Sequence, residues 1–226
     1  MTTENTKVDY NLGTEVEGYL VSKGVATPTT GLLGETPEHK IAVIEEHMRG
    51  IMEVLGLDLT DDSLVDTPKR VAKMYVKELF YGLETKYFPK ATTVANKMGY
   101  SGMVLEKHVA VKSACEHHFV IIDGEASVAY IPEDKVLGLS KINRIVNYFS
   151  RRPQIQERLT EQIYHALVYI LGTENVAVHI SAKHYCVSHR GAEDTKSVTS
   201  TTRIGGKFLA DSALRAEFYS ATNDNS

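Results

Sequence analysis

The chain has 226 residues, of which 42% are apolar and 24% charged, and its 25 Lys+Arg against 29 Asp+Glu give a net charge of −4. This is the composition of an ordinary globular protein, and the negative charge excludes a general attraction to nucleic acid. No apolar run is long enough to span a membrane, the first residues lack the pattern of a secretory signal, and two cysteines are too few for a disulfide scaffold. We expect a cytoplasmic protein without nucleic-acid or membrane partners.

The first 35 residues are expected to form a weakly structured segment. Residues 1–13 are polar and show little periodicity, and a short helix is predicted from Thr14 to Lys23, with Gly24 as its stop. Residues 26–34 are rich in Thr, Pro and Gly, which is typical of a linker.

Two amphipathic helices are predicted between residues 36 and 100. Thr36-Pro37 is a typical helix start, because a hydroxyl caps the first turn and proline suits the first helical position; Gly56 ends the run. A second helix is predicted from Thr67-Pro68 to Gly82. We interpret both helices as core and assembly surface.

From residue 101 the pattern changes to alternating strands and helices. Asp123-Gly124 predicts a hairpin turn between two strands. The order of elements predicts an α+β fold with a mainly antiparallel sheet, and residues 36–226 are interpreted as one domain. Strands are predicted at 103–113, 119–122, 125–131, 175–187 and 197–202, and helices at 141–150, 153–171 and 213–221.

Both cysteines lie close to histidines. Cys115-Glu116-His117-His118 supplies a C-x-x-H pair, and His184-Tyr185-Cys186 supplies a second pair further along the chain. Thiolate and imidazole are good zinc ligands, and three or four of them suffice for a site. Because residues three apart face opposite sides of a regular strand, the first pair shares a metal only where the chain turns or bulges. Residues two apart share a face, which would place both members of the second pair beside the metal.

Three interpretations of this cluster remain open. The cysteines are buried apolar residues and the histidines incidental; or Cys115, His118, His184 and Cys186 close a structural zinc site; or only Cys115, His118 and Cys186 bind zinc, leaving a fourth position for water. In the third, His117 and His184 are free for proton transfer near neutral pH. Spacing alone does not separate the last two, and a disulfide is disfavoured in a chain without an export signal.

A second constellation suits an anion. Ser140 is expected to cap a helix whose free backbone N–H groups attract negative charge, and Lys141 and Arg144 lie on one side of its first turn. Arg190, just past Cys186, could add a cation near the metal. A capped helix with surface cations is also common without any ligand.

Gln156 and Glu157 fall in the first turn of another predicted helix. Glutamate there is ordinarily explained by the helix dipole. Alternatively, one carboxylate accepts two N–H bonds from the N1 and N2 edge of guanine and rejects adenine, which presents an acceptor at N1.

Together these residues resemble the GTP cyclohydrolase I family, in its bacterial form. The likeness runs from about residue 37 to the C-terminus and consists of five motifs in order. The matching segments are Thr67-Pro68-Lys69-Arg70-Val71-Ala72-Lys73-Met74-Tyr75, Cys115-Glu116-His117-His118-Phe119, Gly138-Leu139-Ser140-Lys141-Ile142-Asn143-Arg144, Arg152-Pro153-Gln154-Ile155-Gln156-Glu157-Arg158-Leu159 and His184-Tyr185-Cys186.

The resemblance implies a tunnelling fold, an antiparallel sheet with helices packed on one face, assembled as a homodecamer of two pentameric rings with active sites at subunit boundaries. It also implies the conversion of GTP and water to 7,8-dihydroneopterin triphosphate and formate, the first step toward tetrahydrofolate. One zinc ion per subunit is held by Cys115, His118 and Cys186, which favours the open site, and zinc-bound water adds to purine C8. His184 protonates the ring nitrogen, and His117 shares the proton transfers.

The resemblance further implies residues for the rest of the substrate. Ser140 is a proton carrier near the ribose; a cationic group holds the triphosphate, and Gln156 and Glu157 hold the guanine. The expected substrate-binding residues are Arg70, Leu139, Ser140, Lys141, Arg144, Gln156, Glu157 and Arg190.

Three alternatives are kept beside this prediction. A purine deaminase lacks support because its H-x-E and P-C-x-x-C signature is absent. A non-enzymatic ring-shaped assembly, stabilised by structural zinc, would require the closed four-ligand site. A tunnelling-fold relative acting on another pterin or a deazapurine is disfavoured by the Cys and His set and by the pair Gln156-Glu157.

Overall fold

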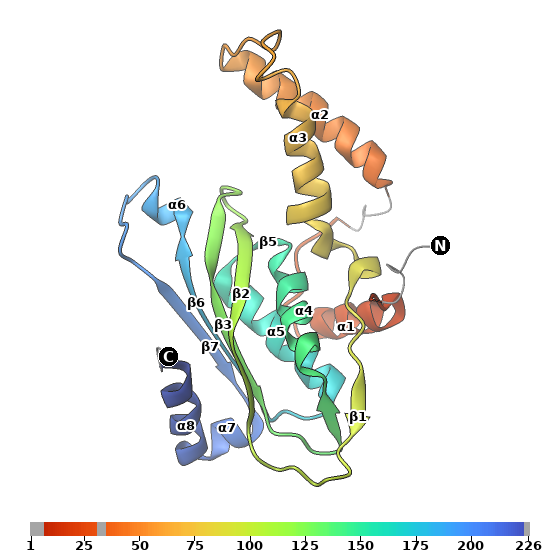
Figure 1. Ribbon diagram of the computed structural model, residues 1–226, viewed down its shortest axis with the longest axis vertical. Coiled ribbons are helices and arrows are strands. Elements are labelled where there is room, and N and C mark those ends of the chain that lie inside the picture. Colours follow the sequence, from red (N-terminus) through yellow and green to blue (C-terminus); the bar gives the residue numbers. More distant parts are fainter. Residues whose placement is uncertain (1–6, 31–34, 224–226) are drawn as a thin grey trace.

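The centre of the protein is a five-stranded sheet, seen in the computed structural model, which describes residues 7–30 and 35–223 (Figure 1). The strand order is β5-β2-β3-β6-β7, and all neighbours are antiparallel except the short β5, which runs parallel to β2. The predicted α+β class with a mainly antiparallel sheet is therefore confirmed. The strands are β2 (Val104–Cys115), β3 (Ile121–Tyr130), β5 (Pro153–Gln154), β6 (Val176–His184) and β7 (Thr199–Ile204).

The main core lies between one face of this sheet and two helices, α4 (Leu139–Ser150) and α5 (Gln156–Leu171) (Figure 1). Twelve of the 16 residues of α5 are buried, since the sheet covers one side of this helix and α1 (Tyr10–Ser22) packs against it as well. Gly172 follows the last residue of α5 in the left-handed conformation, with φ 72°, which glycine adopts readily.

The opposite face of the sheet is covered at one end by α7 (Gly206–Ala210) and α8 (Ser212–Asn223) (Figure 1). Phe208 and Phe218 pack there against Ala129 and Ala177 in a second, smaller core. The structure therefore has these short C-terminal helices on the second face in addition to the helices packed on the first face. The predicted terminal helix at 213–221 is confirmed as part of α8.

The predicted hairpin turn at Asp123-Gly124 is wrong. β3 runs straight through both residues, with Gly124 opposite Val111 on one side and Ala182 on the other. A Cβ at this position would lie 2.2 Å from the carbonyl oxygen of Ser181, so glycine is needed for close strand approach rather than for a turn. The turn comes earlier, between β2 and β3.

The N-terminal part is more ordered than its composition predicted, within residues 7–30. α1 begins at Tyr10 rather than Thr14, because Asp9 caps it by accepting a bond from Leu12 N. Gln162 of α5 holds the chain that follows through bonds to Val25 and Thr27. Predictions for residues 1–6 and 31–34 fall outside the described residues.

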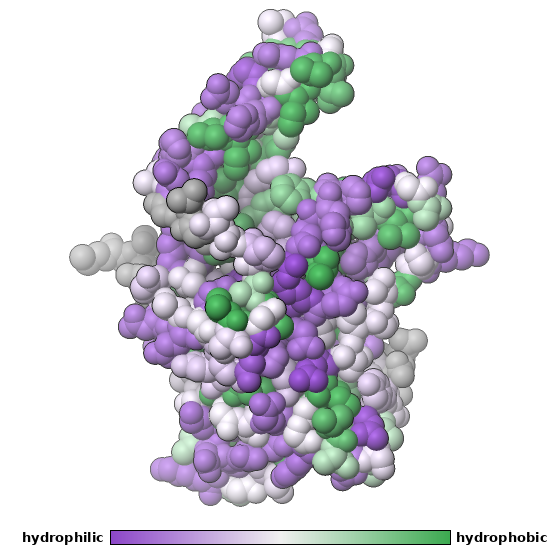
Figure 2. Space-filling view, turned by 180° about the vertical axis from the view of Figure 1, so that it is seen from behind, coloured by the Kyte–Doolittle hydropathy of each residue, from purple (hydrophilic) through white to green (hydrophobic). Residues whose placement is uncertain are grey.

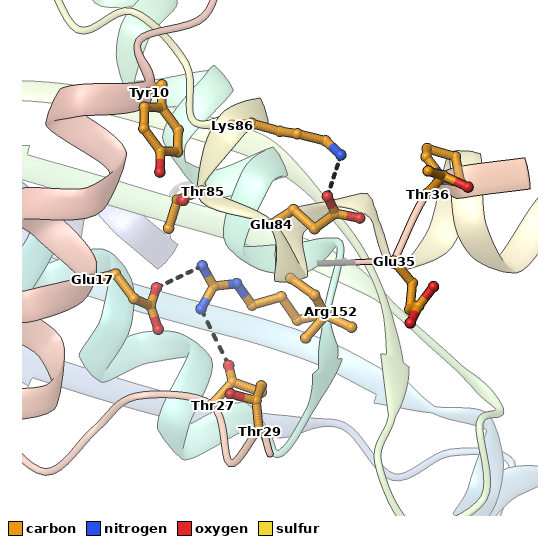
Figure 3. Close-up of a pocket in the computed structure, with 12 residues that line it drawn as sticks. Tyr10, Glu17, Thr27, Thr29, Glu35, Thr36, Glu84, Thr85, Lys86 and Arg152 are labelled. Atoms are coloured by element: carbon orange, nitrogen blue, oxygen red, sulfur yellow. Dashed lines mark hydrogen bonds and ion pairs between the residues drawn. The ribbon is translucent and has the colours of Figure 1, made fainter. Parts of the chain in front are cut away.

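Arg152 holds residues 7–30 against the rest of the protein through contacts with Glu17 and Thr27. Its guanidinium is fully buried and binds Glu17 at 3.0 Å and Thr27 at 3.2 Å (Figure 3). It also packs on the rings of Tyr148 and Phe149. A buried, paired arginine of this kind is costly to disrupt, since removing one partner leaves the other charge without compensation.

Two helices project beyond the sheet as an arm (Figure 1): α2 (Pro37–Val54) and α3 (Thr67–Met74), which continues as the π-helical turn Tyr75–Leu79. The predicted start of α2 is confirmed, because Thr36 Oγ1 accepts from His39 N at 3.2 Å. Figure 2 shows apolar side chains exposed along this arm, where Val54 and Leu55 are 89% and 71% exposed.

None of the helices in the described part of the chain has the length and apolar character to cross a membrane. Short elements connect the arm to the sheet. The connecting elements are the 3-10 turns Tyr81–Leu83 and Thr85–Tyr87 and the paired strands β1 (Thr93–Ala95) and β4 (Lys135–Leu137).

Candidate metal centre

One end of the sheet gathers three side chains that could hold a metal. Cys115, His118 and Cys186 each offer a ligand atom, and these atoms all lie within 4.8 Å of one another. His184 is not part of this group in the described structure. Two thiols and one imidazole at this spacing suit zinc, and three protein ligands are the number found in catalytic sites.

The turn between β2 and β3 brings the first two ligands together. Cys115 N donates to Val120 O and Phe119 N donates to Cys115 O, both at 2.8 Å, and Phe119 has a positive φ of 53°. The chain therefore reverses within the motif, and His118 returns toward Cys115. The prediction that the chain must turn or bulge here is confirmed.

The third ligand arrives differently from what the spacing predicted. β6 ends at His184, and the next residues form the helical turn α6 (Tyr185–Ser188). Cys186 therefore reaches the cluster from a helical turn, and the argument that two residues on one strand share a face does not apply to this pair.

The chemistry of the donors fits a bound cation. Burial, together with the neighbouring Cys115 thiol, raises the pKa of Cys186. Two adjacent thiols resist losing both protons unless a positive charge compensates them, which a divalent metal does.

A partly buried ion pair that was not predicted from the sequence supports the turn. Arg158 of α5 binds both carboxylate oxygens of Glu116, at 2.5 and 3.3 Å, and Glu116 N donates to Gln154 O at 3.0 Å. The bond from Arg158 holds the pKa of the Glu116 carboxyl below its usual value. The signal available in the sequence was the position of an acidic residue inside the metal motif.

The two candidate catalytic histidines differ in their surroundings. The side chain of His117 is 64% exposed, and its Nδ1 lies 3.6 Å from Cys115 Sγ. His184 is half-buried, its Nε2 lies 2.8 Å from Gln156 Oε1, and burial lowers its pKa although the Glu157 carboxylate opposes this. His117 therefore lies beside one candidate ligand, and His184 precedes another, Cys186, by two residues.

The pair predicted to hold guanine points in two directions. Glu157 is exposed in the first turn of α5, whereas Gln156 is only 1% exposed. The amide nitrogen of Gln156 faces Ile180 O, Thr199 O and Thr201 Oγ1 at 2.9 to 3.1 Å, and its oxygen faces His184. Direct recognition of a base by the Gln156 side chain therefore does not fit this arrangement.

Arg190 lies where the sequence placed it, beside the metal ligands, with Nη1 2.7 Å from His118 Nε2. Arg70 lies on the projecting arm, where its guanidinium reaches Asp66 at 3.4 Å. The predicted cations are therefore not all gathered in one place.

The predicted anion-binding helix start also lies apart from the metal ligands. α4 begins at Leu139, so Ser140 is inside the first turn rather than its cap, and Gly138 takes the cap position. Leu139 and Ser140 are exposed, while Lys141 and Arg144 are half-buried. The C-terminal end of α4 is followed by β5, which pairs with the strand that ends at Cys115. Ser140 lies at the opposite, N-terminal end of α4, so the length of this helix, about 18 Å, separates it from the candidate metal cluster.

The fold and this cluster define an α+β protein with a candidate Cys₂His metal centre at the end of an antiparallel sheet. The family model for GTP cyclohydrolase I matches residues 44–223. The chain therefore belongs to the GTP cyclohydrolase I family.

Individual relatives agree with this assignment. A GTP cyclohydrolase 1 from Tolumonas auensis is 54% identical over 205 residues, which cover 91% of this chain and 94% of the relative. One from Vibrio cholerae is 55% identical over 203 residues, covering 90% and 93%, and one from Aeromonas salmonicida is 54% identical over 205 residues, covering 90% and 93%. The predicted family is confirmed, and with it the prediction that the chain is an enzyme with GTP cyclohydrolase I activity.

Proposed function

We propose that the chain opens the purine ring of GTP and forms 7,8-dihydroneopterin triphosphate and formate at a site centred on Cys115, His118 and Cys186. The observation that carries this proposal is the three-donor cluster with an unligated histidine two residues from one ligand. Zn²⁺, when bound there by these residues, supplies a Lewis acid that lowers the pKa of a water molecule. This reaction is the first step toward tetrahydrofolate.

His184 is the proposed proton donor to the ring nitrogen as the purine opens. It is half-buried and bonded to Gln156, so its ring is held in one orientation. Burial lowers its pKa, so the ring is neutral at neutral pH, and it takes up a proton from the attacking water before it passes that proton to the ring nitrogen. His117, exposed beside Cys115, shares the proton transfers and orients the substrate. Ser140 carries a proton near the ribose.

Glu157 is the proposed guanine anchor. Its carboxylate is exposed in the first turn of α5, so it can accept two N–H bonds from the base edge. Gln156 contributes through its backbone N–H, one of those that a helix start leaves free.

The remaining proposed substrate-binding residues are cations that suit a triphosphate bound at a site formed by more than one subunit. Arg190 lies at the metal end of the chain, Lys141 and Arg144 lie at the opposite end of α4, and Arg70 lies on the arm. One chain therefore does not assemble the whole site, which supports a homodecamer of two pentameric rings in which a neighbour's Lys141 and Arg144 complete the site. The free thiols suit a reducing compartment, which we propose is the cytoplasm.

Turnover of GTP with and without a chelator tests the proposal. The protein as purified should produce pterin fluorescence and formate, lose both when the metal is removed, and regain them when zinc is added back. Full activity in a sample shown to hold no zinc would overturn the assigned role of the cluster.

A further inference from the structure

A chain of hydrogen bonds leads from the last strand of the sheet to the imidazole of His184. We propose that Gln156 is a positioning residue: it fixes His184 with a proton on Nε2, so that Nδ1 is the atom that takes and gives the proton during turnover. The inference rests on the proton-transfer role proposed for His184. It gives the Ser/Thr-rich strand β7, to which the sequence assigned no chemistry, a place in the site.

The orientation of the Gln156 amide follows from what surrounds it. Its nitrogen lies 3.1 Å from Ile180 O, 2.9 Å from Thr199 O and 3.1 Å from Thr201 Oγ1. Two of these three atoms are backbone carbonyl oxygens, which only accept. The amide NH₂ must therefore face them, because the flipped amide would set its oxygen against two carbonyl oxygens in a buried site.

The hydroxyl groups around the amide have a consistent direction. Thr160 Oγ1 donates to Gln156 O at 2.9 Å, so its proton is used. Thr201 then donates to Thr160 Oγ1 at 2.7 Å, which leaves the lone pairs of Thr201 to accept from the Gln156 amide. Each group in this network has a partner, and a satisfied buried network of this kind fixes its members in place.

The tautomer of His184 follows from the fixed amide. Gln156 Oε1 lies 2.8 Å from His184 Nε2, and an amide oxygen only accepts hydrogen bonds. Nε2 must therefore carry the proton, which leaves Nδ1 of the neutral ring with its lone pair. The Gln156 side chain is 1% exposed, so water does not compete for this contact.

Gln156→Leu removes the contact while keeping a side chain of similar size. We expect kcat for GTP to fall about 100-fold, in the range by which a positioned acid or base accelerates a reaction, with KM changed less than about threefold and one zinc per subunit retained. Nitrogen-15 spectra of the whole enzyme, labelled in its histidine rings, should show Nε2 of His184 protonated in the parent and a mixture of tautomers in Gln156→Leu. The His184 signals are identified by their loss in His184→Ala.

Two neighbouring threonines provide a matched pair on β7. Thr201→Val removes one acceptor from the Gln156 amide, whereas Thr202→Val makes the same exchange one residue on, where the hydroxyl contacts His179 at 2.8 Å. We expect kcat to fall about 3- to 10-fold in Thr201→Val, a smaller loss than in Gln156→Leu because two acceptors remain, and to stay unchanged in Thr202→Val. This pair decides the question if Gln156→Leu does not fold.

Unchanged kcat in both Gln156→Leu and Thr201→Val would overturn the inference, as would a rise in KM at constant kcat, which would return Gln156 to substrate binding. His184→Ala distinguishes the positioning role of Gln156 from the proton transfer by His184. If His184→Ala abolishes turnover while the Gln156 and Thr201 variants keep it, only the positioning role fails. If His184→Ala itself keeps turnover, the proposed proton transfer fails.

Discussion

Arg158 and Glu116 form a two-point ion pair that connects helix α5 to the turn carrying two of the candidate metal ligands. Glu116 stands between Cys115 and His117, so its carboxylate and its backbone N–H fix the turn from both sides. Pairs of planar guanidinium and carboxylate groups combine charge with a defined geometry. The pair is partly shielded from solvent, which makes it stronger than an ordinary surface ion pair.

Arg158→Leu should loosen this turn without touching a ligand. We expect the affinity for zinc to fall about 10- to 100-fold, the usual effect of removing a group that orients a ligand, as measured by competition with a chromogenic chelator. Arg215→Leu is the control, because Arg215 binds backbone carbonyls near α7 and lies on α8. Equal zinc affinity in parent and Arg158→Leu would show that the turn holds its shape alone.

His184→Ala distinguishes an open metal site from a closed one. Because the cluster contains Cys115, His118 and Cys186 without His184, we expect zinc to stay at one per subunit while turnover of GTP is lost. Metal analysis of the purified variant checks this directly. Loss of zinc would instead indicate a fourth protein ligand.

Glu157→Gln should weaken GTP binding by replacing an ionised acceptor with a neutral amide. A charge-assisted contact of this kind contributes about 1.5 to 3 kcal/mol, so we expect Kd for GTP to rise at least 10-fold, measured by calorimetry. Glu161→Gln makes the same exchange one turn further along α5, where the carboxylate faces Arg203 and His165. Similar affinities in the two variants would remove Glu157 from base recognition.

Gly124→Ala should destabilise the sheet. The added Cβ would lie 2.2 Å from Ser181 O and 2.5 Å from Ala182, so the strands must separate, at a cost of about 3 kcal/mol. Gly18→Ala on α1 meets no atom within 4 Å and should leave the thermal midpoint unchanged or slightly raised. Equal midpoints for the two variants would show that β3 and β6 adjust freely.

His165 makes stability depend on pH. Burial lowers its pKa below the ordinary 6.5; Glu161 and Glu174 oppose this, whereas Arg203 and Lys23 add to it. The unfolded chain therefore takes up the proton first, so stability is full above pH 6.5 and falls as the pH drops below that value. We expect the thermal midpoint to fall between pH 7 and 5.5, and to fall less in His165→Gln. The same fall in both proteins would assign the effect to other groups.

The sequence predicted those features that rest on local rules. Thr36 caps α2, and α5 ends at residue 171 as predicted, because the caps and ends of helices depend on adjacent residues. Cys115 and Cys186 lie in one cluster that could hold a metal ion, as their residue types suggested.

Features that depend on distant neighbours were not predictable in this way. Asp123-Gly124 has the composition of a turn, but Gly124 is required by the backbone of β6, a strand much later in the chain. The surroundings of the Gln156 side chain were not predictable either, because Thr199 and Thr201, which contact its amide, lie more than forty residues away in the sequence. Arg158 was overlooked because its partner Glu116 lies on another element.

The division of the metal ligands between two segments has a consequence for folding. Cys115 and His118 meet within one turn, but Cys186 is brought to them by the pairing of β6 with β3 and of β3 with β2. Pairings between distant segments form late because of their loop-closure entropy. High affinity for zinc would therefore arise only once the strands β2, β3 and β6 have paired, and a subunit in which these strands have not paired would bind zinc weakly.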